Sequence, residues 1–532
     1  MPPLRHPDEY ELLDRSSEDS RDSFDIDGAD FESYGPGRSP SFLRSRTTRL
    51  GRFLAFFTSV ARRRTGEAAW KRRKQPIRPR RRISPRQCCF IFNSFLGIIL
   101  AVILLTAIIR PSYTRLPNHY KALRQAVRSS SESGRGNPRN EKIFIAASLY
   151  DRDGSLAGGQ WGENVLQLVD MLGENNVFLS IYENDSGKQG ESALLEFERR
   201  VKCSKKIVYE PHLDVEDISH ITLPNGTNRT KRIAYLAEVR NRALRPLDEP
   251  GDVKFDKLLY LNDVVFDPID ALQLLFSTHI GDNGVAKYRA ACAVDFINPF
   301  KFYDTFATRD LEGYSMGVPF YPWFSTAGNA ESRNDVLQQK DAVRVRSCWG
   351  GMVAFDAEFF QKTKAANTEN LGDRRRADAN SPARFRAEED HYWDASECCL
   401  IHADIQLPPH KSEEPIDTGV YMNPFVRVAY DTRTLSWLGA TRRFERLYST
   451  IHNIINHIGR VPKFNPRRTE IAGEEVEDVV WVQGKNPGEG SYQTVKRRAG
   501  TGGFCGRRNL QVMVPNPTSG QKNWETLPVP SV

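Results

Sequence analysis

The stretch that decides the fold reads Lys257-Leu258-Leu259-Tyr260-Leu261-Asn262-Asp263-Val264-Val265-Phe266-Asp267. Its apolar run is too short for a helix and is rich in strand-forming residues, so it predicts a buried central strand interrupted by a carboxylate. Ligands of open α/β sheets bind where such strands end, and a carboxylate there suits a divalent cation that also holds phosphate groups. The alternative interpretation of Asp263 is a cap for the helix predicted to begin at Asp267-Pro268.

Strands and helices alternate around this stretch. The pattern predicts strands over 143–150, 176–182, 206–209, 288–295 and 343–355, a short final strand over 400–405, and helices over 161–172, 192–201 and 233–245. Such alternation favours a mostly parallel central sheet in an α/β domain. We place this domain at residues 141–460.

Several polar residues follow predicted strands or lie on the helix before the central one. Asp151 and Glu183 follow strands, where a base or ribose would be contacted. Asp295 closes another strand and Asn262 precedes Asp263, and both are candidates for binding the donor. Arg240 lies on the amphipathic helix, and its planar fork of donors suits a diphosphate. The alternatives are solvated turn acids and an exposed helix arginine.

Three further groups are candidates for chemistry. Trp349-Gly350-Gly351 interrupts a predicted strand, where the two glycines indicate close approach of the backbone to an acceptor sugar or to another strand. Asp394 and Glu397 belong to an acidic segment, and a positioned carboxylate accepts a proton from an attacking hydroxyl, although acids at a helix start are often only solvated. His402 is a candidate second ligand for the metal of Asp263.

Residues 88–109 carry no charge and predict one transmembrane helix, roughly 33 Å long at the helical rise. The arginines of 78–86 outweigh the basic residues after the helix, so the N-terminus is expected in the cytoplasm and the rest in the lumen of a secretory compartment. The formal net charge of +8 includes a basic run over 61–74 that precedes this membrane segment, so we expect no nucleic-acid partner.

The segments outside the α/β domain have a different composition. Residues 1–87 lack apolar periodicity and are predicted to be a disordered cytoplasmic tail, 110–140 a luminal stem, and 461–532 a tail of low order. Sequons at Asn184, Asn225 and Asn228 are available for glycosylation only in the lumen. The cysteines after the helix form an even set compatible with disulfides, whose pairing the spacing leaves open: Cys203, Cys292, Cys348, Cys398, Cys399 and Cys505.

Five ordered blocks between residues 141 and 430 resemble the fungal capsule-associated α-1,3-mannosyltransferases, the cryptococcal mannosyltransferase-like glycosyltransferase family 69. The blocks are Tyr235-Leu-Ala-Glu-Val-Arg-Asn-Arg-Ala-Leu244, Tyr260-Leu-Asn-Asp-Val-Val-Phe266, Ser347-Cys-Trp-Gly-Gly-Met-Val-Ala-Phe-Asp356, Ala395-Ser-Glu-Cys-Cys-Leu400 and Asn423-Pro-Phe-Val-Arg-Val-Ala-Tyr430.

The resemblance implies a Golgi-type, single-pass type II membrane enzyme with a GT-A-like nucleotide-sugar-binding fold. It also implies GDP-mannose as donor, an oligosaccharide or polysaccharide acceptor of the cell wall or capsule, a retaining reaction, and Mn²⁺ or Mg²⁺ as cofactor. Such folds usually carry a metal-binding Asp-x-Asp, whereas Asn262-Asp263-Val264 holds one acid. Another nucleotide-sugar donor, and a membrane-anchored assembly or export factor without turnover, are the alternatives.

Overall fold

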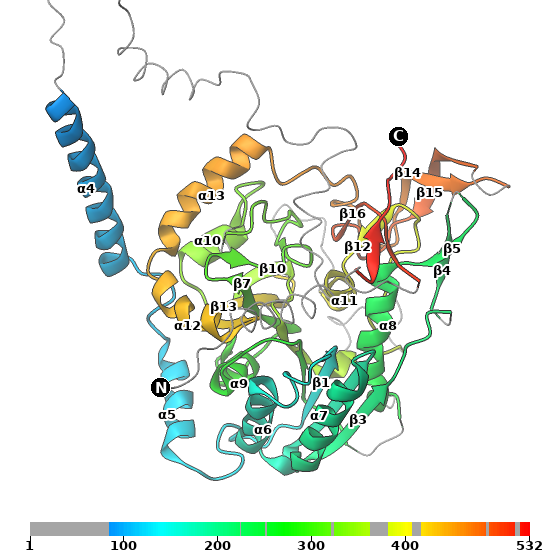
Figure 1. Cartoon of the computed structure of the whole chain (residues 1–532), viewed down its shortest axis with the longest axis horizontal. Helices are drawn as coiled ribbons and strands as arrows, with labels where there is room; N and C mark the ends of the chain where they lie inside the picture. Colours follow the sequence, from blue (N-terminus) through cyan, green and yellow to red (C-terminus); the bar gives the residue numbers. More distant parts are fainter. Residues whose placement is uncertain are drawn as a thin grey trace, which may run out of the picture. The chain divides into compact units, whose positions relative to one another are not determined.

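The computed structural model describes residues 85–216, 218–223, 225–249, 253–320, 324–361, 381–406, 417–485, 489–515 and 522–531. The predicted cytoplasmic tail, 1–87, lies outside these residues except for its last three. Within the described part, a mixed sheet forms the centre of the domain that follows the N-terminal helix (Figure 1).

The central sheet has the strand order β3-β2-β1-β6-β11-β7-β13-β10-β9, with β8 paired to β7. Strands β3, β2, β1 and β6 are parallel, β11 is antiparallel to both of its neighbours, and β7 and β13 are parallel to each other. The strands are β1 Ile143–Leu149, β2 Val177–Asn184, β3 Ser204–Glu210, β6 Lys257–Leu261, β7 Ala290–Asn298, β8 Lys301–Phe302, β9 Arg309–Asp310, β10 Val343–Ser347, β11 Met352–Asp356 and β13 Val420–Ala429.

Strand β6 is central because both of its faces are covered. Leu258 and Tyr260 pack in one hydrophobic cluster, and Leu259 and Leu261 pack in the other, as the two-residue period of a strand requires. Apolar residues of α8 (Arg232–Leu244) belong to the first cluster, and those of α6 (Gln160–Leu172), α7 (Gly187–Arg200) and α9 (Pro268–Ser277) belong to the second. The predicted α/β class and the mostly parallel core of its sheet are confirmed.

Two predicted strands have a different structure. The stretch 343–355 is two strands, β10 and β11, because Gly350 and Gly351 both have φ of 65° and interrupt the extended chain between them. The segment predicted as a final strand over 400–405 is the end of helix α11 (Glu397–Ile405). Its first turn is capped by the Ser396 hydroxyl, which accepts a bond from the Cys398 amide.

The predicted stem, 110–140, packs on the domain. Helix α5 (Asn118–Ser129) contacts α9, and the hydroxyl of the fully buried Tyr120 accepts a hydrogen bond from Asn423 at 2.6 Å. Arg124 forms an ion pair with Asp270 of α9. Polar pairing at buried positions makes this segment part of the fold rather than a separate stem.

The predicted tail of low order, 461–532, contains five strands in its described residues. Strands β14 (Glu475–Gln483) and β15 (Gly490–Arg498) form a hairpin, and β17 (Gln511–Met513) pairs with β18 (Trp524–Thr526) (Figure 1). Strand β16 (Gly506–Arg508) pairs with β12 (Trp393–Ala395), and Cys505 forms a disulfide with Cys399 of α11. The covalent bond and these long-range pairings order a segment whose local composition suggests disorder.

We expect Cys505→Ser to lower the free energy of unfolding by about 2–5 kcal/mol, because the Cys399–Cys505 disulfide joins residues 106 apart in sequence. Chemical denaturation of the full chain in detergent measures this change. Cys203→Ser is the matched control, since Cys203 is buried but has no disulfide. Equal effects of the two substitutions would contradict a stabilising role for the crosslink.

Helix α4 (Pro85–Ile109) contains a stretch, Cys89–Ile109, that is long and apolar enough to cross a membrane. Its large apolar side chains are exposed, as those of a lipid-facing helix would be. One helix near the N-terminus therefore has the properties of a membrane anchor or a signal. The remaining elements of note are β4 (His220–Thr222), β5 (Asn228–Thr230), α10 (Glu331–Leu337), α12 (Thr432–Thr441) and α13 (Glu445–Gly459).

Candidate functional site

Asn262, the residue before Asp263, is held through its backbone amide, its backbone carbonyl and its side-chain oxygen. Its amide donates to the Gly351 carbonyl at 2.9 Å, and its own carbonyl accepts from the Trp161 indole at 2.9 Å. Its side-chain oxygen accepts from Arg240 at 3.1 Å and from Trp349 at 3.3 Å. These bonds fix the backbone from which the Asp263 side chain projects, at the carboxyl end of β6.

Two more carboxylates, Asp295 and Asp304, lie at Tyr430, whose hydroxyl is also within reach of the charge of Asp263. The Tyr430 hydroxyl donates to Asp295 at 3.1 Å, and the Asp304 amide donates to the other Asp295 oxygen at 3.3 Å. Burial raises the pKa of Tyr430 well above its usual range, and the negative charges of Asp295, Asp304 and Asp263 raise it further. We call Asp263, Asp295 and Asp304 the carboxylate cluster.

The segment between β10 and β11, which contains Gly350 and Gly351, contacts this cluster. The Gly351 amide donates to Asp304 at 3.2 Å. A Cβ on Gly350 would lie 2.0 Å from the Ala293 carbonyl oxygen, and one on Gly351 would lie 2.6 Å from a Val264 methyl carbon. The close approach of the two glycines is to β7 and to the loop that follows β6, with one backbone donor directed at a carboxylate.

Burial raises the pKa of Asp304, while Arg240 and the amides of Gly350 and Gly351 oppose that rise. Two carboxyl groups in contact inside a protein cannot both be charged at low cost unless a positive group neutralises them. Oxygen ligands of this kind suit Mn²⁺ or Mg²⁺, which commonly take one or two protein carboxylates and complete their coordination with phosphate and water. The carboxylate cluster therefore offers the type of oxygen donor that the implied cation prefers, with Asp295 and Asp304 in direct contact.

A buried ion pair lies behind the cluster. Arg240 donates through Nε to Glu397 at 3.0 Å, and its guanidinium lies 4.6 Å from the ring centre of Trp349. Glu397 is fully buried, and its second oxygen accepts no hydrogen bond from the described residues. Trp349 is also buried, so it holds Arg240 and Asn262 and offers no face to an acceptor sugar.

The acids after β1 and β2 form a second group at the same edge of the sheet. Asp151 accepts bonds from the amides of Leu156 and Ala157, at 3.1 and 2.9 Å, and therefore shapes its own loop. Burial raises the pKa of Glu183 to about 7; the Ser186 hydroxyl opposes the rise and the negative Asp151 reinforces it. Both side chains are buried.

Between pH 4.5 and about 7, the folded state keeps on Glu183 a proton that the unfolded chain has released, so the free energy of unfolding falls as pH rises. We expect Glu183→Gln to remove this decline and to be more stable than the wild type at pH 8 by roughly 3 kcal/mol. Unfolding curves at pH 5 and pH 8 measure it. Glu196→Gln, at an exposed position on α7, should keep the wild-type decline, and parallel profiles for all three proteins would contradict the assignment.

Two predicted site residues have structural partners instead. Asp394 is buried, pairs with Lys231 at 2.9 Å and accepts the Gln511 amide at 2.9 Å, so it joins the start of α8 to the C-terminal strands. The structure gives Asp394 these structural partners, and its role toward an acceptor hydroxyl stays a prediction. The pairing of Glu397 with Arg240 gives that carboxylate a positioning role in place of the predicted proton transfer.

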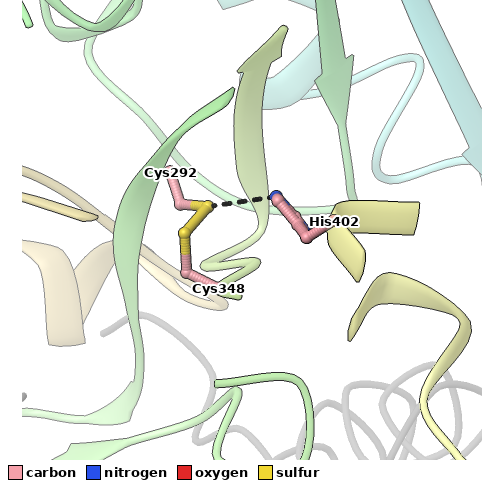
Figure 2. A group of neighbouring side chains, drawn as sticks. All are labelled: Cys292, Cys348 and His402. Carbon is pink, nitrogen blue, oxygen red and sulfur yellow. Dashed lines mark hydrogen bonds between the residues drawn. A yellow bond between two sulfur atoms is a disulfide. The ribbon is translucent and has the colours of Figure 1, made fainter. Parts of the chain in front are cut away.

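His402 was the predicted second metal ligand, and its surroundings exclude that role. Its Nδ1 lies 2.7 Å from the Cys398 carbonyl, and its Nε2 faces Cys292 Sγ at 3.8 Å (Figure 2). Cys292, Cys348 and His402 lie close enough to share a metal, but the two sulfur atoms are joined in a disulfide and are not thiolate ligands (Figure 2). Burial lowers the pKa of His402 to about 4, so the ring is neutral in this apolar environment.

The structure thus brings Arg240, Asn262, Asp263, Asp295, Trp349, Gly350, Gly351 and Glu397 into one connected region. Asp304 and Tyr430 complete it and were not predicted. Asp304 follows the two-residue strand β8 and so has no strand-end pattern around it. Tyr430 directly follows β13. Ligand-binding groups of α/β sheets often follow strands, so a search for tyrosines at these positions would have identified Tyr430.

The family model described as cryptococcal mannosyltransferase 1 matches residues 142–404. No match was found among curated proteins. Among solved structures, the mannosyltransferase PcManGT from Pyrobaculum calidifontis, in complex with GDP-Man and Mn²⁺, is 13% identical with a TM-score of 0.30, over 69% of this chain and 76% of that one. Mannosyl-3-phosphoglycerate synthase from Rubrobacter xylanophilus is 11% identical with a TM-score of 0.26, over 71% of this chain and 96% of that one.

The matched residues contain the parallel half of the sheet and all three members of the carboxylate cluster. They also contain four of the five sequence blocks that carry the predicted resemblance. Residues 142–404 are therefore similar to the cryptococcal mannosyltransferase 1 family, and they form the α/β domain that the sequence predicts.

Proposed function

We propose that this protein transfers mannose from GDP-mannose, in α-1,3 linkage, to a glycan acceptor of the cell wall or capsule. Similarity to a mannosyltransferase family supports the class of reaction. The single observation that carries the site assignment is the contact of Asp295 with Asp304 and with the Tyr430 hydroxyl, on which the charge of Asp263 also acts.

Asp263, with Asp295 and Asp304, would hold Mn²⁺ or Mg²⁺. A cation there supplies positive charge against the donor diphosphate. Two carboxylates of the cluster compensate for the missing acid of the Asn262-Asp263-Val264 motif, which makes an Asp-x-Asp unnecessary. The backbone hydrogen bond of Asn262 with Gly351 fixes the position of the next residue, Asp263. The Gly351 amide orients the Asp304 carboxylate.

Arg240 and Glu397 act as positioning residues. Arg240 holds the Asn262 side chain, and its positive charge favours the ionised form of Asp304. Glu397 in turn keeps Arg240 in place. Glu183, at the end of β2, is the proposed contact for the donor base, where its carboxylate can accept from the ring N–H and the exocyclic amino group of guanine.

The proposed location is the membrane of the Golgi or another secretory compartment, with α4 as a single span and the catalytic domain in the lumen. Two disulfides, Cys292–Cys348 and Cys399–Cys505, support an oxidising compartment. Of the three sequons, Asn225 and Asn228 are exposed and available for glycosylation, whereas Asn184 is buried and donates to the Tyr235 hydroxyl at 2.8 Å.

The test is transfer of radiolabelled mannose from GDP-mannose by the full chain in detergent, with Mn²⁺ and a panel of mannose-terminated acceptors. Methylation analysis of the product reads the linkage. UDP-glucose and UDP-xylose serve as competing donors.

An α-1,3-linked mannose in the product supports the proposal. Transfer from a UDP-sugar alone would overturn the assignment of the donor. If the wild type transfers sugar from none of these donors with acceptors present, the result would favour an assembly or export factor without turnover.

A further inference from the structure

Helix α13 presents its apolar side chains to the outside. Ile451, Ile454, Ile455 and Ile458 recur at the three- and four-residue spacing of one helix face, and they are 47, 54, 37 and 75% exposed. Phe464, just beyond the helix, is 88% exposed. We call these five residues the α13 apolar face.

The opposite side of the same helix is polar and buried. His452 Nε2 lies 3.1 Å from the Met316 carbonyl oxygen, Asn456 donates to that same oxygen at 3.1 Å, and the Val318 amide donates to Asn456 at 2.9 Å. An amphipathic helix that covers the core of a water-soluble protein buries its apolar face and exposes its polar face. Helix α13 does the opposite. An exposed apolar stripe of this kind marks a surface that is covered in the working molecule.

The chain itself indicates what covers it. The candidate membrane span ends at Ile109, and the Ser112 amide donates to the Arg442 carbonyl at 3.0 Å. Arg442 donates in return to the Tyr113 carbonyl at 3.0 Å. Three residues reach roughly 10 Å at full extension, so the connection between α12 and α13 lies within that distance of the point where the span ends.

Charge around the α13 apolar face suits a lipid surface. Residues 432–464 contain one acid, Glu445, which is buried against Arg427. The same residues contain six basic side chains: Arg433, Arg442, Arg443, Arg446, Arg460 and Lys463. Apolar residues on one face with flanking basic groups are typical of helices that lie in the headgroup region of a bilayer.

We infer that the α13 apolar face inserts into the bilayer leaflet in which α4 ends, so that the catalytic domain is docked on the membrane and not merely tethered to it. This inference rests on the proposed role of α4 as a membrane span. It fixes the orientation of the domain, because a span and a docked helix are two attachments. Acceptors carried at the membrane surface would then meet the site in one defined orientation.

The test uses the full chain in vesicles of phosphatidylcholine and phosphatidylserine, with Cys88 and Cys89 replaced by serine. A surface cysteine at Ile458→Cys carries an environment-sensitive fluorophore, while the free thiols of Cys203 and Cys398 are buried and are shielded from labelling. Leu195→Cys, at an exposed apolar position on α7, is the matched control. Carbonate extraction reports separately whether α4 spans the membrane.

A docked face predicts a blue shift at position 458 and loss of its fluorescence when spin-labelled lipids are added, with neither change at position 195. Ile451→Asp with Ile454→Asp should abolish both changes at position 458 while the chain stays carbonate-resistant. Equal emission at 458 and 195 in carbonate-resistant chains would overturn the docking. A blue shift without lipid quenching, together with energy transfer between labelled copies, would overturn it in favour of a dimer. Extraction of the chain by carbonate would reject the membrane span itself.

Discussion

Asp263→Asn is expected to lower the rate of mannosyl transfer by a factor of about 10²–10³ or more while the chain stays folded, in line with the loss of one electrostatic contact to a developing charge. The substitution keeps the shape of the side chain and removes the negative charge that would hold the cation. Asn262 retains its contacts with Gly351, Trp161, Arg240 and Trp349, so the backbone should not move. Initial rates with GDP-mannose and Mn²⁺ measure the effect.

Asp282→Asn is the matched control, because Asp282 is an exposed turn residue far along the sequence from the cluster. It should transfer mannose at the wild-type rate. Asp304→Asn should resemble Asp263→Asn. If Asp263→Asn retained wild-type rates at saturating and at limiting Mn²⁺, the carboxylate would have no part in the reaction.

Arg240→Met is expected to have the largest effect on stability. It leaves Glu397 fully buried without its partner, and breaking a buried pair in this way costs about 3–5 kcal/mol. Because Met keeps much of the side-chain length, packing against Trp349 is partly retained. Chemical denaturation of the full chain in detergent measures the loss.

Arg245→Met is the control from the end of the same helix, where the side chain is exposed and pairs with Glu238 at the surface. Exposed pairs contribute about 0–1 kcal/mol. The double variant Arg240→Met with Glu397→Gln should regain much of the lost stability, because it buries no unpaired charge. A double variant as unstable as Arg240→Met would show that the loss came from packing alone.

The sequence predicted the fold well wherever hydrophobic periodicity decides structure. The run from Lys257 to Leu261 is buried on both faces, and this pattern identifies a central strand without any knowledge of its neighbours. The prediction from sequence failed where single residues decide where an element ends or begins. Gly350 and Gly351 divide one predicted strand into two, and Ser396 starts a helix where a strand was expected.

The site was predicted in part for a related reason. Asp263 and Asp295 lie at ends of strands, which periodicity reveals, whereas Asp304 reaches the site from a loop that only the folded chain brings there. Whether a charged residue is paired is also a tertiary property. Nothing in the sequence near Asp394 and Glu397 indicates that either carboxylate is paired. Their partners, Lys231 and Arg240, are about 160 residues away along the chain.

The same limit explains the segments at both ends of the domain. Nothing local in residues 110–140 or 461–532 predicts order, because the contacts that order them are long-range. Tyr120 bonds to Asn423, and Cys505 is joined to Cys399. Loop-closing contacts of this kind leave no periodic trace in the sequence.

The most direct test of the carboxylate cluster is binding of Mn²⁺ followed by electron paramagnetic resonance, in which the signal of free aqueous Mn²⁺ falls as the protein binds it. With GDP present, the wild-type chain should remove about one equivalent of Mn²⁺ from solution, in keeping with a cation shared between carboxylates and phosphates. Asp263→Asn and Asp304→Asn should leave the signal as high as GDP alone does. If both variants sequester Mn²⁺ as strongly as the wild type, the cation does not bind at this cluster.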